Sequence, residues 1–423
     1  MSTGNLLYGL YPYGKYIHAG LVGIAGGYTD DQIGYLPDRF DAIAYNKDGT
    51  KSAIFSSGVE GNALEKITFE IVDTGCGKAE FTFRRLPTNT ELSVDQRIDI
   101  HLFNDPRPWW SGYILNCPTQ GSTADSYKYT AHGYYNKLDA VVIFADYLSD
   151  EISEIVSEIA RQAELKSGLN YNRNLLINTN YTASRIQFDG VTAKDALKQL
   201  SDFAIDYVYG VDEYRRLFFR PRNREVNEQA RFWVGEHLNS FEPQEDAEKI
   251  YNVIPIKGAA VDGNGEQWIA TVEDAASQLK YGIREKILTL PSAYSAADAE
   301  RWGRNQLTSV AYPAQSAKVK VVHLEYPLAD GRFNVRKMWT DGEAVITDRH
   351  GVAHQYPISK LKYTVSASDG IKCDMELGKP PETVDVYLSN LSRYAKDLEL
   401  LQAAATKQLK QEVKNGKSKQ LQI

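Results

Sequence analysis

The stretch Lys66–Arg84, KITFEIVDTGCGKAEFTFR, alternates polar and apolar residues on both sides of a Thr-Gly-Cys-Gly interruption. Alternation with a period of two places one face of a strand in a core and the other face in water. A glycine-containing break between two such runs is typical of a hairpin. The alternation recurs at Gln96–Leu102, Trp109–Leu115 and Ser126–Ala131. Residues 39–145 are therefore predicted to form a small antiparallel β-barrel domain.

Helical spacing replaces strand alternation in the middle of the chain. Residues 149–166, SDEISEIVSEIARQAELK, place their apolar side chains on one helical face, with Ser149 or Asp150 as the N-cap. A second amphipathic helix is predicted at 192–203, and a β-hairpin follows it. We expect 146–245 to be a central α+β domain.

Strand signals return in the last third, with a predicted hairpin around Asp369-Gly370 and one amphipathic helix within 292–310. The series DGEAVITD, RHGV, AHQYPISKLKY repeats the strand-turn-strand layout of DQRIDIHLF, NDPRP, WWSGYI. Chance recurrence of hairpins is the alternative to a repeat. The repeat predicts a second barrel domain at 246–379. The predicted fold class is β-rich α+β, in which two tube-type antiparallel β-barrels flank an α+β module.

The two ends of the chain differ from the rest. Residues 1–38 are rich in glycine and tyrosine and are predicted to be an arm that orders against a neighbour, or else a flexible terminus. Residues 380–423 are predicted to form a C-terminal helix and tail. Its four-three apolar spacing indicates a coiled coil, with a helix packed on its own domain as the alternative. The seam consists of Val384, Leu388, Leu391, Ala395, Leu398, Ala405 and Leu409.

The composition argues against several classes of protein. The 423 residues are 43% hydrophobic and carry a net charge of −7, which disfavours a surface that grips nucleic acid. Three widely spaced cysteines without a CxxC pair disfavour a disulfide framework or a zinc ribbon. No apolar run approaches the roughly 20 residues that a membrane-spanning helix needs, so no membrane span is predicted.

Motifs for catalysis are missing from the sequence: there is no GxSxG, P-loop, HExxH or GxGxxG after a strand. His350 and His354 flank a turn at Gly351 and are predicted to be solvent-facing hairpin residues, not zinc ligands. Acidic pairs that resemble the acid and base of a glycosidase, Glu60 with Glu70 or Asp95 with Asp99, are expected by chance among 55 carboxylates. Asp95 and Asp99 also lie on a strand pattern that explains them as solvated positions. We expect no enzyme activity, no cofactor and no metal site.

Interface candidates are concentrated around the two adjacent tryptophans. Side chains of neighbouring strand residues point to opposite faces, so one of Trp109 and Trp110 is predicted to lie in the core. The other is predicted to be exposed or buried against a partner, and Arg107 is a further candidate for a partner contact, because Trp and Arg are favoured at interfaces. A sugar-stacking platform is the competing interpretation. The basic run Arg220–Arg224, RPRNR, is predicted to be a solvated loop or a subunit contact.

A series of motifs in a fixed order resembles the phage tail hub proteins, the baseplate hub or late-control-D-like group. The resemblance runs from about Ile67 to Leu391. The motifs are ITFEIVDTGCGKAEFTF, DQRIDIHLF, WWSGYIL, SYKYTAHGYYNKL, YVYGVDEYRRLFFRPR, IYNVIPIKG, YGIREKILTLPSAYSAADAERWGRNQL and GVAHQYPISKLKYTVSASDGIKCDMELGKPPE.

The resemblance implies a structural subunit of a tail tip, not an enzyme. Such hubs are homotrimers whose two barrels per chain adapt a hexameric tail tube to a trimeric spike or fibre. Implied partners are a tail tube or distal tail protein and a spike, fibre or tape-measure protein, with DNA passing through the lumen without specific binding. The implied location is the virion tail tip, after assembly in the host cytoplasm. A tail-associated cell-wall hydrolase and a carbohydrate-binding receptor module are the alternatives.

Overall fold

A computed structural model describes residues 35–36, 39–56, 64–118, 126–261, 267–290, 295–321, 324–327, 333–366, 368 and 370–378. These residues form two compact units. The first consists of the described residues of Met1–Ala183, Gln187–Glu245 and Ala314–Pro380, and the second of those of Ser184–Ile186 and Asp246–Pro313. The predicted C-terminal helix, and the predicted N-terminal arm apart from residues 35 and 36, lie outside the described residues.

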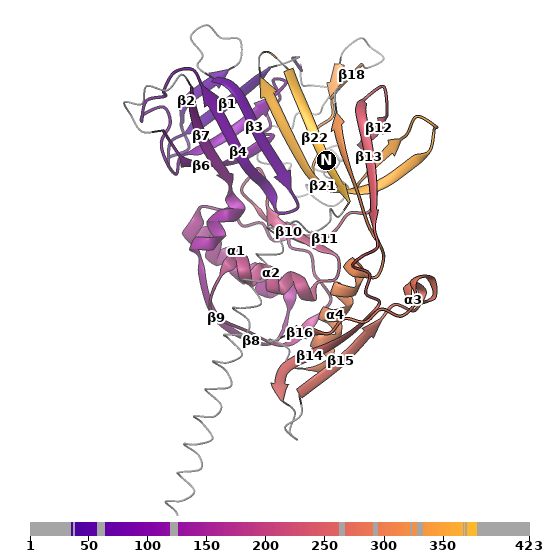
Figure 1. Cartoon of the computed structure of the whole chain (residues 1–423). Coiled ribbons are helices and arrows are strands. Elements are labelled where there is room, and N and C mark those ends of the chain that lie inside the picture. Colours follow the sequence, from indigo (N-terminus) through magenta and orange to yellow (C-terminus); the bar gives the residue numbers. More distant parts are fainter. Residues whose placement is uncertain are drawn as a thin grey trace, which may run out of the picture. The chain divides into compact units, whose positions relative to one another are not determined.

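Seven strands of the first unit form a group that we call the first lobe (Figure 1). They pair antiparallel in the order β3-β4-β7-β6-β5-β1-β2 and bury alternate apolar side chains, as the sequence pattern predicts. The strands are β1 (Phe40–Tyr45), β2 (Lys51–Ser56), β3 (Leu64–Val72), β4 (Gly75–Phe83), β5 (Arg97–Leu102), β6 (Trp110–Asn116) and β7 (Tyr127–Gly133).

A second group of strands, the second lobe, belongs to the same unit. Its main ladder runs β20-β21-β22-β17-β13, and β12 pairs with β20. The predicted hairpin around Asp369-Gly370 is confirmed as β21 and β22. The strands are β12 (Val226–Trp233), β13 (Leu238–Asp246), β17 (Ala314–Val321), β18 (Glu325–Pro327), β19 (Phe333–Val335), β20 (Glu343–Thr347), β21 (Ala353–Ser366) and β22 (Gly370–Gly378).

The two lobes have the same strand order. In the first lobe β5-β6-β7-β4-β3 are neighbours, and in the second lobe β20-β21-β22-β17-β13 are neighbours in the corresponding sequence. A register shift interrupts β6 between Ile114 and Asn116, and an equivalent shift interrupts β21 between Ile358 and Lys360. The hairpin similarity that the sequence indicated therefore extends to five strands and to a shared bulge.

Closed barrels, which we expected, are not seen among the described residues. The pairing forms one open path from β13 to β2. The physical reason lies in β3, whose outer edge pairs with β21 of the second lobe and is therefore not available to β2. The predicted β-rich α+β class is confirmed. Instead of forming two closed barrels, however, the two lobes are joined edge to edge in one sheet.

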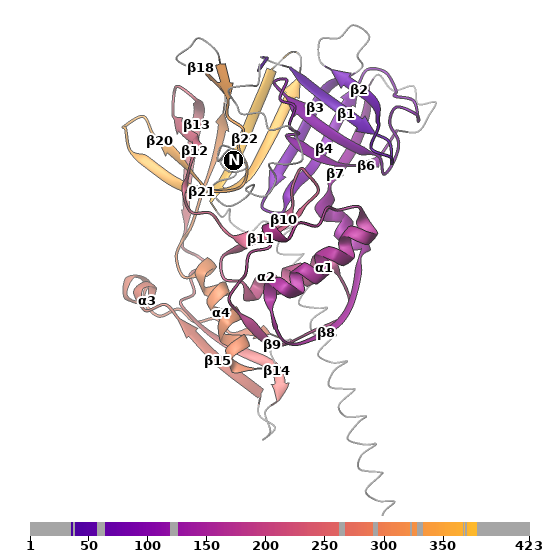
Figure 2. The same ribbon diagram turned by 180° about the vertical axis from the view of Figure 1, so that it is seen from behind.

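An α+β module lies beside the first lobe (Figures 1 and 2). Residue Glu151 caps α1 by accepting hydrogen bonds from the backbone N–H groups of Ser153 and Glu154, so the predicted cap at Ser149 or Asp150 is wrong. The reason is that the preceding strand continues to Glu151. The module contains β8 (Val142–Glu151), α1 (Ile152–Ser167), β9 (Thr182–Thr192), α2 (Ala193–Phe203), β10 (Tyr207–Val211) and β11 (Leu217–Pro221).

The second unit is a three-stranded sheet with two helices. The predicted amphipathic helix within 292–310 is confirmed as α4, which packs on β14 and β15 with Ala299, Trp302 and Leu307 buried. The range 246–379, predicted as one domain, thus contains most of this unit as well as strands β17–β22 of the first unit. The predicted domain boundaries stay predictions. The elements are β14 (Val253–Val261), β15 (Gln267–Glu273), α3 (Ala275–Tyr281), β16 (Leu288–Leu290) and α4 (Ala296–Val310).

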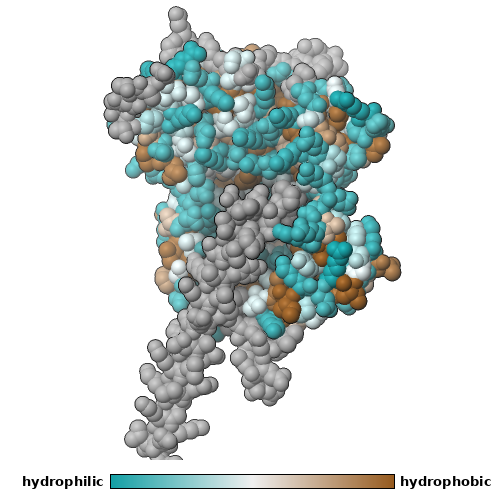
Figure 3. Space-filling view, in the orientation of Figure 1, coloured by the Kyte–Doolittle hydropathy of each residue, from teal (hydrophilic) through white to brown (hydrophobic). Residues whose placement is uncertain are grey.

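On the face drawn in Figure 3, hydrophilic residues predominate and apolar residues form separate spots. None of the helices in the described residues is both long and apolar enough to cross a lipid bilayer.

Candidate assembly site

The contact between the two lobes, which we call the lobe junction, begins with the pairing of β3 and β21. The ladder runs from Lys360 opposite Val72 to Ser366 opposite Lys66. On one face the rings of Phe69 and Tyr363 stack with centroids 4.8 Å apart, and both side chains are fully buried. Offset stacking of buried aromatic rings adds about 0.5–1.5 kcal/mol to the gain from burial. The two lobes therefore share one hydrophobic core.

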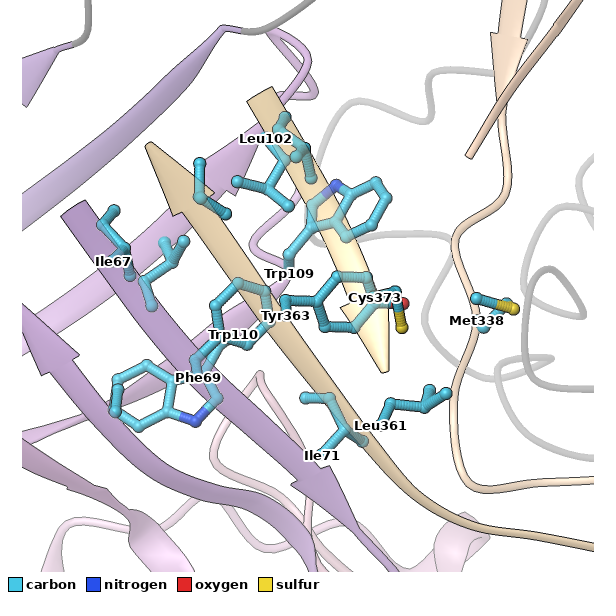
Figure 4. Packing of buried hydrophobic residues seen from close by; sticks show 14 of the residues in the cluster. Ile67, Phe69, Ile71, Leu102, Trp109, Trp110, Met338, Leu361, Tyr363 and Cys373 are labelled. Carbon is cyan, nitrogen blue, oxygen red and sulfur yellow. The ribbon is translucent and has the colours of Figure 1, made fainter. Parts of the chain in front are cut away.

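Trp109 extends this core from the turn before β6. Its ring lies edge-on to Tyr363, with centroids 5.7 Å apart, so Tyr363 contacts both Phe69 and Trp109 (Figure 4). The ammonium of Lys337, from the second lobe, lies 5.6 Å from the centre of the Trp109 ring and donates to the carbonyl of Pro108 at 3.0 Å. A cation above an indole face is attracted by the ring quadrupole.

Both tryptophans are buried, so the prediction that one indole is exposed or covered by a partner chain is wrong. Trp109 is 2% exposed and Trp110 is fully buried. The two rings point in different directions (Figure 4), but the second lobe covers Trp109 within the same chain. Trp110 packs beside Gly112, where a Cβ atom would lie 2.3 Å from the indole.

Arg107 also belongs to the lobe junction. Its guanidinium pairs with Asp105, with Nε 2.9 Å from Oδ1, and donates to the hydroxyl of Tyr35 at 3.0 Å. The Asp105 carboxylate is buried and lies 3.9 Å from the ammonium of Lys337. Burial by itself raises the pKa of Asp105, but Lys337 and Arg107 outweigh it and hold that pKa below its ordinary value.

The basic run at Arg220–Arg224 forms intramolecular ion pairs and is only in part the predicted solvated loop: Arg224 is 55% exposed, whereas Arg220 is buried. The subunit contact stays a prediction. Nη1 of Arg220 lies 2.9 Å from Oδ2 of Asp341, and both side chains are buried. Arg222 pairs with Asp73 of the first lobe at 2.9 Å. The run therefore connects the β10–β11 hairpin with both lobes. The arginines at every second position make the run visible in the sequence. Their acidic partners are far away in the chain, so the sequence does not identify them.

Thr340 completes the junction next to this ion pair. Its hydroxyl donates to the carbonyl of Val72 at the end of β3, with a distance of 2.9 Å. Thr340 and Asp341 are each 5% exposed, because the first lobe and the hairpin cover them. On the outer side Lys360 pairs with Glu70 at 2.9 Å.

The remaining acidic candidates that the structure describes, Glu70, Asp95 and Asp99, are held in ion pairs. Asp99 is buried, accepts a hydrogen bond from the Ser111 hydroxyl at 2.6 Å and pairs with Arg97, so its predicted solvation is wrong. Asp95 is exposed and pairs with Lys137. Glu60 lies outside the described residues.

The described residues also give no indication of a metal site. His354 lies beside Asp348 in the β20–β21 hairpin, as the sequence predicts. No three His, Cys, Asp or Glu side chains of the described residues are placed to hold a metal ion. The three cysteines are free thiols. Five further candidates lie outside the described residues: Val384, Leu388, Leu391, Leu398 and Leu409.

A buried histidine predicts acid sensitivity at this site. Nδ1 of His101 lies 3.0 Å from the carbonyl of Asp105. Burial lowers the pKa of His101, and the Asp105 carbonyl with nearby carboxylates offsets this only in part. A folded-state pKa below the unfolded value, about 6.5, gives stability that is present above pH 6.5 and lost as the pH falls through the folded pKa.

The free energy of unfolding is therefore expected to decrease below about pH 6.5 by up to roughly 1.4 kcal/mol per pH unit. His101→Asn, whose amide can replace Nδ1, should reduce that slope in urea unfolding series. The same substitution at exposed His350 is the control, because solvent surrounds this side chain in the folded chain. An unchanged slope in His101→Asn would contradict the assignment.

Tail proteins, two of them from prophages, are among the solved structures with a similar fold. The 43 kDa tail protein of prophage MuSo2 from Shewanella oneidensis is 13% identical, with a TM-score of 0.58 over 80% of this chain and 98% of that chain. A tail protein from Neisseria meningitidis is 10% identical, with a TM-score of 0.56 over 80% and 96%. A prophage tail protein from Listeria monocytogenes is 13% identical, with a TM-score of 0.52 over 85% and 99%.

The chain thus has the fold of these tail proteins, as the resemblance in its motifs predicts. No protein-family model and no curated protein sequence matches it.

Proposed function

We propose that this chain is a structural subunit of a phage tail tip, in which three copies form a ring of six lobes around a channel. The observation that carries the proposal is the shared strand order of the two lobes, including the bulge in β6 and β21. A trimer of a duplicated unit has three-fold symmetry with six similar positions, which suits contact with a hexameric tube on one side and a trimeric spike or fibre on the other.

The lobe junction supports a structural role. Its charged groups, among them Asp105, Lys337 and Asp341, are paired with one another or with Arg107 and Arg220, and they connect remote segments. Charged side chains held in such pairs fix the positions of the segments that carry them, which is a structural role. In the ring, the junction keeps the two lobes of each subunit at a fixed position.

The channel is proposed to pass DNA or a tape-measure protein without binding it specifically. The net charge of −7 suits this role, because an acidic lining repels phosphates. The apolar seam from Val384 to Leu409 is proposed to form a coiled coil that holds a spike or fibre. We place the subunit at the virion tail tip, assembled in the host cytoplasm and without enzyme activity.

Purified protein is expected to form trimers at high concentration or with a tail-tube partner. Mass photometry across a concentration series measures the species, and end-on electron micrographs should show rings with six density peaks. A chain that stays monomeric at every concentration and with that partner would contradict the proposal. Cell-wall clearing in a zymogram by the pure protein would favour the hydrolase alternative.

A further inference from the structure

The sheet that joins the two lobes has one face in the shared core and the other face in solvent. Six neighbouring strands, β17-β22-β21-β3-β4-β7, run across the lobe junction (Figure 1). Alternate side chains on each of them are buried, from Val319 on β17 to Tyr129 on β7. The residues between these point away from the core, because side chains alternate along a strand. We call the solvent side of these six strands the lysine face.

The strand register determines which side chains share the lysine face. Along one row, Lys320 is opposite Asp374, and Asp374 is opposite Lys362. The row continues from Lys362 to Glu70 on β3. The whole face carries the lysines Lys66, Lys78, Lys128, Lys318, Lys320, Lys360, Lys362 and Lys372, and the acidic residues Glu70, Glu80, Asp374 and Glu376. These eight lysines and four acidic residues give a formal charge of +4, opposite in sign to the −7 of the whole chain.

Most of these lysines are not neutralised by a neighbour on the face. Lys78 pairs with Glu80 at 2.6 Å, and Lys360 pairs with Glu70 at 2.9 Å. Five others are exposed and form no ion pair with any described residue: Lys66, Lys128, Lys318, Lys320 and Lys362. The unpaired positive charge therefore extends across both lobes.

Charges on neighbouring strands of the lysine face lie close enough to act on one another. The pKa of the Glu80 carboxylate is lowered, first by the hydrogen bond from Lys78. Lys128 on β7 and Lys362 on β21 lower this pKa further through their charges. Lysines of the first and the second lobe thus contribute to one positive field on this side of the sheet.

The composition of the lysine face favours one class of ligand. Its uncharged side chains are mainly hydroxyls, from Thr68, Thr82, Thr130 and Thr364, and hydroxyls donate to phosphate oxygens in protein–DNA contacts. No aromatic side chain points to this face from the described residues of the six strands, so bases cannot stack there as they do on proteins that bind single strands. Protein interfaces, in contrast, are depleted of lysine and have apolar anchors at their centre.

We propose that the lysine face binds the phosphate backbone of double-stranded DNA without sequence preference. Six strands that are about 4.8 Å apart span roughly 24 Å. A duplex carries one negative charge per about 1.7 Å, so this length presents about 14 phosphates to the five exposed, unpaired lysines. The net charge of −7, which argues against nucleic-acid binding, describes the whole chain and not this face. The inference goes beyond the proposed function, because it concerns one face of a single chain and does not depend on a ring.

The test measures the affinity of the full chain for a random-sequence duplex by fluorescence anisotropy in a salt series. Five phosphate contacts should reduce the affinity by about 10²–10³-fold between about 50 and 200 mM salt. Lys128→Gln/Lys362→Gln removes two of these charges, so the affinity at about 50 mM salt should fall by about tenfold or more, and the slope of log affinity against log salt should decrease by about 1.8. Both side chains are exposed, so the melting temperature should match the wild type.

Lys47→Gln/Lys166→Gln is the matched control, because both lysines are exposed and neither lies on the six strands; its slope should equal that of the wild type. A wild-type chain that does not bind the duplex at about 50 mM salt, or equal slopes for the two double variants, would overturn the proposal. Poly-glutamate that competes better than the duplex would also overturn it and assign the face to an acidic protein. In each of these cases, trimers in mass photometry would leave the proposed ring standing.

Discussion

Replacing Arg220 with methionine is expected to lower the free energy of unfolding by about 3–5 kcal/mol, the usual loss when one member of a buried ion pair is removed. Nη1 of Arg220 lies 2.9 Å from Oδ2 of Asp341, and the two side chains are 7% and 3% exposed. Methionine retains the aliphatic volume but leaves the carboxylate at the lobe junction without this partner. Urea unfolding of the two proteins measures the difference.

The loss should depend on pH in a defined direction. Burial raises the pKa of Asp341 above its ordinary value, although Arg220 and Arg222 oppose the rise. Removing Arg220 raises that pKa further. A raised folded-state pKa gives stability that is complete below the unfolded pKa, about 3.9, and is lost as the pH rises through the folded value. The destabilisation should therefore be larger at pH 7.5 than at pH 5.

Two further variants show whether the pair itself is responsible. The double variant Arg220→Met/Asp341→Leu removes both charges and should recover most of the loss, because an apolar pair needs no counter-charge. Arg224→Met is the matched control: Arg224 is 55% exposed, and its pairing with Asp206 should contribute less than about 1 kcal/mol. Equal losses in Arg220→Met and Arg224→Met would contradict a buried pair.

Strand positions and helix positions follow from local sequence patterns, and these predictions are confirmed most often. The alternation in Lys66–Arg84 predicts β3 and β4, and the apolar stripe in 149–166 predicts α1. The repeated strand-turn-strand layout predicts the correspondence of β5-β6 with β20-β21. Periodicity depends on a side chain's own strand or helix, so neighbours in sequence suffice to recognise it.

The lobe junction could not be predicted from these patterns, because its members are far apart in the chain. Lys337 reaches Pro108 across 229 residues, and Arg220 reaches Asp341 across 121. Alternation assigned Trp109 and Trp110 to opposite faces but could not indicate that a second lobe covers one face. A period of two identifies the face of a strand and not what lies against it.

A second large effect is expected from Gly75→Ala, which should lower the free energy of unfolding by about 3 kcal/mol or more. Gly75 has φ +105°, a conformation that side chains disfavour, and a Cβ atom there would lie 1.9 Å from the carbonyl oxygen of Val211. That oxygen belongs to β10, which pairs with β4 at this point. Because backbone occupies the space, the β10–β11 hairpin has to move away from the first lobe.

Gly351→Ala separates this clash from the cost of backbone conformation alone. Gly351 also has positive φ, +83°, but nothing lies within 4 Å of a Cβ atom there, so the loss should be only about 1–2 kcal/mol. Hydrogen exchange supplies a second measurement: the amide of Val211, which donates to the carbonyl of Thr74 at 3.0 Å, should lose protection in Gly75→Ala and keep it in Gly351→Ala. Equal losses of stability in the two variants, with unchanged protection of Val211, would mean that the close approach of β10 to β4 does not hold the hairpin. The ion pairs of Arg220 and Arg222 would then have to hold it alone.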